Sequence, residues 1–179
     1  MSGDPQYFRR GYDQCVRDAI LRFHRTQSVE DARRYVREAV TRAGTNEDRI
    51  LDSLDKFERY ISWWESEHPV LADVRIRLEL PLFAGVALGG LVSRIDYTDR
   101  GYRAVLLGGN TAGWMAQDRF PVIQRALASL YEVPEQEFSV GVQELNGSGL
   151  ATTTFTQLDV QAAVAAAMDA AEQVANTIG

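Results

Sequence analysis

Apolar residues in the first third of the chain recur at steps of three and four, the spacing that places them on one face of a helix. Ser28 precedes one of these runs and Asp31 follows three residues later, an arrangement typical of helix starts. Gly44 marks a natural end for the same helix. We therefore expect three amphipathic helices before the break at His68-Pro69, with apolar stripes in Tyr12–Phe23, Val29–Val40 and Ile50–Trp64.

After Pro69 the period changes to two, which predicts a strand over 74–80 with one solvent-exposed face. The next strands form a hairpin over 88–109 whose second strand is almost entirely apolar, as in a central buried strand. The remaining expected elements are a helix, two strands and a closing alanine-rich helix, at Phe120–Tyr131, Phe138–Leu145, Leu150–Gln157 and Val160–Ile178. This order predicts one α/β domain, with helices in residues 1–68 and the sheet core and closing helix in residues 69–179.

Composition narrows the class of protein without naming a function. The 179 residues are 45% hydrophobic and 25% charged, which is typical of a globular protein. The single cysteine, Cys15, rules out an internal disulfide and fits a reducing cytoplasm, and the two histidines argue against a structural zinc site. No apolar run approaches the ~20 residues of a membrane span, and no signal peptide is visible. We expect a cytoplasmic protein that does not enter membranes.

Charge is distributed unevenly along the chain. The net charge is −6, and nothing after Arg125 is basic. The arginines of the first two helices alternate with acids, which favours a mixed, solvated surface over a phosphate-binding one. We therefore expect any contact with DNA to be weak, and a protein partner to be the preferred target.

The predicted hairpin, LGGLVSRIDYTDRGYRAVLLGG, resembles the catalytic hairpin of RecB-type PD-(D/E)XK nucleases. In that family the first strand carries Gly-x-x-Asp-Arg-Ile-Asp and the second ends in Asp-x-Lys. This chain matches the pattern at Gly90, Arg94, Ile95 and Asp96, and departs from it at Ser93, Leu106 and Gly108. In the helix that follows, Gln124 matches the start of the family's Gln-x-x-x-Tyr signature, but Ala128 stands at the tyrosine position.

The resemblance implies a mixed β-sheet flanked by helices and a nuclease site that has lost its chemistry. Such enzymes hold Mg²⁺ with carboxylates and use a lysine to orient or activate water. Leucine, glycine and serine at the three departing positions cannot do this. We therefore expect a pseudonuclease without metal or cofactor, whose altered cleft is lined by Ser93, Leu106, Gly108, Gln124 and the loop residue Trp114.

Several alternatives stay open at this point. A divergent Mg²⁺-dependent nuclease would need relocated acids, for which Asp96 and Glu79 are the candidates. DNA phosphates would be met by the arginine-bearing helices within residues 9–42, which include Arg9 and Arg10, and by Arg75, Arg77 and Arg94. The emptied cleft would also suit a small ligand of a biosynthetic protein. Trp114 is equally well explained as a partner contact or as a lid on the core. As a pseudonuclease, the chain would serve as a binding or scaffolding subunit of a DNA-processing or defence complex.

Overall fold

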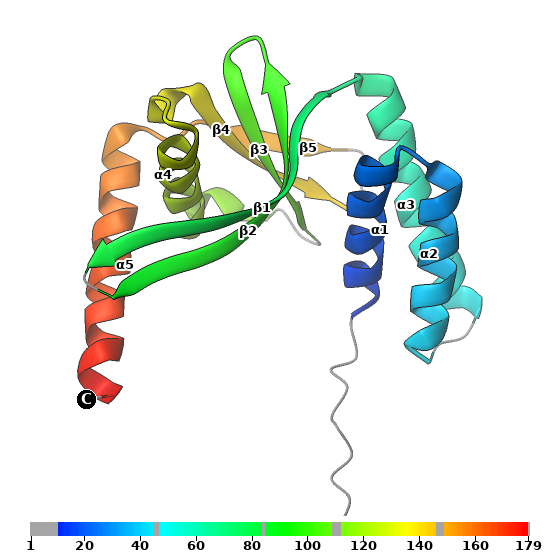
Figure 1. The fold of residues 1–179 in the computed structure, drawn as a ribbon, viewed down its shortest axis with the longest axis horizontal. Helices are drawn as coiled ribbons and strands as arrows, with labels where there is room; N and C mark the ends of the chain where they lie inside the picture. Colours follow the sequence, from blue (N-terminus) through cyan, green and yellow to red (C-terminus); the bar gives the residue numbers. More distant parts are fainter. Residues whose placement is uncertain (1–10, 45–46, 84, 109–111, 146–148, 179) are drawn as a thin grey trace, which may run out of the picture. The chain divides into compact units, whose positions relative to one another are not determined.

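The computed structural model contains helices and strands in the order predicted from the sequence (Figure 1). It describes residues 11–44, 47–83, 85–108, 112–145 and 149–178. Internal contacts divide the chain into two compact units, one formed mainly by residues 1–67 and the other by residues 68–144 and 149–179. A single domain stays a prediction.

The first unit consists of helices α1 (Tyr12–Thr26), α2 (Val29–Arg42) and α3 (Glu47–Glu67). Their apolar stripes are buried as predicted, and the fully enclosed residues include Val16, Ile20, Val36 and Phe57. Ser28 caps α2, because its hydroxyl accepts the N–H of Asp31 at 3.2 Å. The predicted helix start is thus confirmed.

The arginines of this unit are paired with acids. Arg22 binds Asp31 at 2.5 Å, and Arg33 binds Glu58 at 2.5 Å across helices α2 and α3. Asp31 also accepts from Arg34. A surface in which cations and carboxylates alternate in this way offers little net field to a phosphate backbone, as the charge pattern predicted. Arg9 and Arg10 lie outside the described residues.

The second unit is built on a mixed five-stranded sheet, counted over the described residues, in the order β1-β2-β3-β4-β5. Its strands are β1 (Val70–Phe83), β2 (Val86–Thr98), β3 (Gly101–Gly108), β4 (Phe138–Glu144) and β5 (Leu150–Thr153). Only β3 and β4 pair in parallel within that sheet. The apolar strand β3 is central, as predicted. Strand β5 is shorter than expected, because the closing helix already begins at Gln157.

Two helices cover one face of this sheet. Helix α4 (Arg119–Tyr131) lies in the connection between β3 and β4, between the short 3₁₀ turns η1 (Trp114–Ala116) and η2 (Glu135–Glu137). Helix α5 (Gln157–Ile178) packs on α4. The core joins Ala104, Val140 and Val142 of the sheet to Phe120 and Leu127 of α4. None of the helices in the described ranges is long and apolar enough to cross a membrane.

Strand β2 pairs with β3 over only part of its length. The last paired residues are Arg94 and Val105, whereas β1 and β2 remain paired as far as Phe83 and Val86. The result is a two-stranded arm that leaves the sheet, and Figure 1 shows β1 bending as it enters this arm. Arg75 adopts a left-handed φ of 60° at the bend, opposite Ser93. The positive φ accounts for a local break in strand geometry.

The break also changes which side chains share a face. In a regular strand, residues three positions apart point to opposite faces. Val92 and Ile95 nevertheless belong to the same buried core. Arg94 lies between these two residues and Asp96 follows Ile95. The side chains of Arg94 and Asp96 are bonded to each other away from that core. The regular alternation of side chains between the two faces of β2 is therefore interrupted at Ser93. The side chains of Arg94 and Asp96 point to the face opposite α4.

Gly101 begins β3 at a point where no side chain fits. Its φ is 110°, and a Cβ there would lie 2.4 Å from the carbonyl oxygen of Glu137. We expect Gly101→Ala to lower the free energy of unfolding by about 2 kcal/mol or more, because it adds both backbone strain and overlap. Urea unfolding measures the loss. Gly89→Ala, where a Cβ meets nothing within 4 Å, is the matched control and should change stability little. Equal losses of stability in both variants would show that the close approach of Glu137 in η2 does not restrict position 101.

Candidate functional site

Ser93 occupies the point where β2 separates from β3. Its hydroxyl oxygen accepts the backbone N–H of Leu107 at 3.1 Å. The hydroxyl thus provides a hydrogen-bond acceptor to a strand amide at the point where β2 no longer pairs with β3. Ser93, one of the positions that differ from the nuclease pattern, thus has a structural role where β2 separates from β3.

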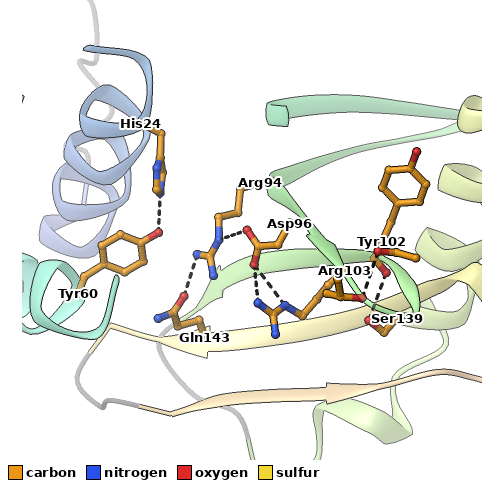
Figure 2. A network of polar contacts seen from close by, with 10 residues as sticks. His24, Tyr60, Arg94, Asp96, Tyr102, Arg103, Ser139 and Gln143 are labelled. Carbon is orange, nitrogen blue, oxygen red and sulfur yellow. Dashed lines mark hydrogen bonds and ion pairs between the residues drawn. The ribbon is translucent and has the colours of Figure 1, made fainter. Parts of the chain in front are cut away.

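Asp96 is the acid of the hairpin motif, and it is completely buried among cations (Figure 2). Arg94 donates from Nε to Oδ1 at 2.8 Å, and Arg103 donates from Nη2 and Nε to Oδ2 at 3.0 and 3.2 Å. Gln143 of β4 accepts from Nη1 of Arg94 at 2.8 Å. Both carboxylate oxygens are therefore engaged by guanidinium groups. A metal ion at Asp96 would be repelled by two positive charges in a low-dielectric interior.

Arg94 has only 1% of its surface exposed, so it is not placed to contact phosphate from solvent. The other two arginines proposed for phosphate contact, Arg75 and Arg77, are exposed on β1. Glu79, the second candidate for a relocated acid, is exposed on the same strand and pairs with Gly89. Asp96 lies seven positions after Gly89 on β2, roughly 20 Å of extended chain. The structure therefore does not bring Glu79 and Asp96 together.

Gln124 joins two loops to helix α4 instead of facing a cleft. Its side chain is completely buried. The amide nitrogen donates to the carbonyls of Glu135 and Phe155 at 3.1 and 3.0 Å, and the amide oxygen accepts the N–H of Phe155 at 2.8 Å. This three-bond arrangement fixes the start of β4 and the approach to α5 relative to α4.

Trp114 lies in the core, which agrees with its interpretation as a lid on the core. It is 4% exposed, and its ring meets Phe120 edge-on with the centroids 4.9 Å apart. Phe155 contacts it in the same way. The tryptophan therefore packs beneath the loop and is not presented to a partner.

Tyr131 lies three residues after Ala128 on α4. Its ring packs with Tyr102 and Phe138, and its hydroxyl lies 3.4 Å from Oδ2 of Asp73. Burial, followed by the charge of Asp73, raises the pKa of Tyr131 to about 12. The phenol therefore stays protonated at neutral pH and does not serve as a base.

Leu106 lines an apolar groove of about 510 Å³ beside the arm. The groove is bounded by the inner face of the β1–β2 arm, by α4 and by the alanine-rich face of α5; its lining includes Leu78, Leu80, Leu88, Ile123, Ala126 and Ala167. Ser93, Gly108, Gln124 and Trp114 do not line it. Of the five residues expected to form one cleft, only Leu106 is therefore found in a cavity of this kind.

Helices α4 and α5, which form part of the groove's walls, lie outside the predicted hairpin. In the sequence, the signal for this wall is the alanine-rich pattern of the last helix. In the structure the second half of α5, from Ala171 to Thr177, is largely exposed. The small side chains at positions 166, 167 and 170 leave the groove open.

Among the described residues, no group of three or more histidine, cysteine, aspartate or glutamate side chains is placed to hold a metal ion. No protein-family model matches the chain, and no curated protein is significantly similar to it. The structure itself defines a mixed α/β protein with a five-stranded sheet in its described part. The resemblance to RecB-like nucleases thus depends on the hairpin residues and the order of elements.

Asp96 should be essential to stability. We expect Asp96→Asn to lower the free energy of unfolding by about 3 kcal/mol, because it leaves the buried guanidinium of Arg94 and the partly exposed guanidinium of Arg103 without their shared anion. Chemical denaturation compared with Asp99→Asn, at an exposed position of the adjacent turn, isolates the effect of burial. If the two variants unfold at the same denaturant concentration, Asp96 is not the anion that holds this network.

Proposed function

We propose that this chain is a binding protein without catalytic activity, on a scaffold similar to that of RecB-like PD-(D/E)XK nucleases. In this view it serves as a binding or scaffolding subunit of a DNA-processing or defence complex. The observation that carries the proposal is the condition of Asp96. The one acid retained in the hairpin motif is fully buried and bonded to Arg94 and Arg103.

Phosphodiester hydrolysis by a metal-dependent route needs carboxylate oxygens that converge on an open position. In the described part of the hairpin, Asp96 is bonded to two arginines and Asp99 lies exposed in the turn, and no group of three metal-ligating side chains forms there. Leu106 presents a hydrocarbon side chain to the groove, and Gly108 presents none. Glu79 is exposed but remote from Asp96 along the strand. These features argue against a divergent nuclease with relocated ligands.

The apolar groove beside the arm supports a protein partner. Aliphatic side chains of β1, β2, β3 and α4 and methyl groups of α5 form its walls, with Asp118 and Arg119 also lining it. Apolar concavities with polar borders suit the apolar face of a partner helix or extended segment. Leu91, which also lines the groove, is 51% exposed. Burial of these side chains on association would contribute the driving force.

A small apolar ligand is the second candidate, because about 510 Å³ is enough volume to hold one. DNA is a less favoured ligand than a protein partner or a small apolar molecule. Arg75 and Arg77 offer two exposed cations on β1, but the net charge of −6 opposes association with a polyanion.

Metal and nuclease measurements test the loss of catalysis. Titration of the intact protein with Mn²⁺ by calorimetry should show no stoichiometric site, and incubation with duplex and single-stranded DNA in Mg²⁺ or Mn²⁺ should give no cleavage. Glu79→Gln, a surface change that leaves the core intact, provides the decisive comparison. A micromolar metal site or DNA cleavage that disappears in Glu79→Gln would establish the divergent nuclease instead.

The groove is tested by Leu88→Asp, which places a charge on the wall that β2 contributes. Affinity capture from the source cells, followed by cross-linking to locate the contact, should yield a partner with wild type and lose it with Leu88→Asp. Leu158→Asp, at a leucine 76% exposed and outside the groove, should retain it. Retention by Leu88→Asp would contradict a groove-bound partner. Native mass spectrometry of the purified protein tests the second candidate, a small apolar ligand, since a resident small molecule would add a discrete mass.

A further inference from the structure

A polar pocket of about 530 Å³ lies where the β2–β3 turn meets β4 and β5. Register places Arg103 of β3 beside Ser139 of β4. Both residues lie on the face opposite α4, because their neighbours Ala104 and Val140 are in the core on the other side. Figure 2 shows Arg103 and Ser139 close together at this end of the sheet. The pocket is therefore separate from the apolar groove.

The only charged side chains that line this pocket, among the described residues, are those of Arg100 and Arg103. Arg103 shares the single carboxylate of Asp96 with Arg94, so these three side chains together carry a formal charge of +1. Arg103 is 25% exposed, and its two bonds to Asp96 use Nε and Nη2, which leaves Nη1 for another acceptor. The carboxylate that orients Arg103 thus does not cancel the positive charge around it.

Arg100 adds a second cation at the mouth of the pocket. The turn that carries it is held by Thr98, whose hydroxyl donates to the carbonyl of Gly101 and accepts the N–H of Arg100. Asp99 and Glu137 share a neighbouring hollow with Arg100. In the described part of the chain, neither forms an ion pair with it. Its guanidinium group is therefore available to a ligand.

Hydroxyl and amide donors complete the lining. Thr152 and Thr153 end β5, Thr154 follows them, and Gln136 also lines the pocket. Within the described residues none of these four side chains takes part in a hydrogen bond. Two guanidinium groups together with unused hydroxyl donors suit an oxyanion with several acceptor oxygens and more than one negative charge, the properties of a phosphate group.

We propose that this pocket binds a phosphate group, either as inorganic phosphate or as the phosphoryl group of a small phosphate monoester. Arg103 and Arg100 supply the charge, and the hydroxyls of β5 direct the remaining oxygens. The site is independent of the groove and of the proposed partner. It remains in place whether or not the protein is a pseudonuclease.

The test is an NMR titration of the intact ¹⁵N-labelled protein with inorganic phosphate, at constant ionic strength maintained by chloride. The amide signals of Thr152 and Thr153 should shift and saturate. Arg100→Gln should raise the phosphate concentration at half-saturation about tenfold, since it removes a charge-assisted hydrogen bond. Arg37→Gln removes an exposed arginine of α2 that does not line the pocket and should leave that concentration unchanged.

Thr154→Val is a second variant that keeps the charge, and it should also weaken binding. A parallel titration with an alkyl phosphate monoester identifies the source of the phosphate group. Tighter binding of the ester assigns the pocket to a phosphorylated small molecule, and equal or weaker binding assigns it to the free anion. Absence of a saturable shift in wild type, or identical titrations for wild type and Arg100→Gln, would overturn the proposal.

Discussion

The second unit depends on one buried carboxylate shared between two arginines. Asp96 is bonded to Arg94 on its own strand and to Arg103 on β3, and Arg94 continues to Gln143 on β4. Three neighbouring strands are thus joined at the place where β2 stops pairing with β3. Desolvation of these charges is expensive, so the network stabilises the fold only as a complete set of bonds.

This constraint explains both proposed binding regions. On one side of the sheet, the separation of β2 from β3 at Ser93 opens the apolar groove between the arm and the helices. On the opposite face, Asp96 orients Arg103 without neutralising both arginines, which leaves positive charge at the polar pocket. An acid used in this way is not free for metal chemistry. The proposed binding role and the proposed absence of catalysis therefore have one physical origin.

The sequence predicted the elements well because they depend on local periodicity. The three helical stripes, the Ser28 cap and the central position of β3 are all found in the structure. The cleft was predicted less well, because it depends on which residues face each other after folding. A change of face at Ser93 follows from the positive φ of Arg75 and a side-chain hydrogen bond, neither of which a hydrophobic pattern records. Gln124 and Trp114 looked like cleft residues, yet they pack inside the unit.

The measurement that tests this account most directly is a double-mutant cycle between Asp96 and Arg103. Asp96→Asn, Arg103→Gln and the combined variant would be unfolded in urea, with and without Mn²⁺. We expect the two sites to be coupled by more than about 1 kcal/mol, because the fully buried carboxylate of Asp96 is bonded to the partly exposed guanidinium of Arg103, and we expect Mn²⁺ to change no value. Additive losses, or stabilisation of the wild type by Mn²⁺ that Asp96→Asn abolishes, would contradict it.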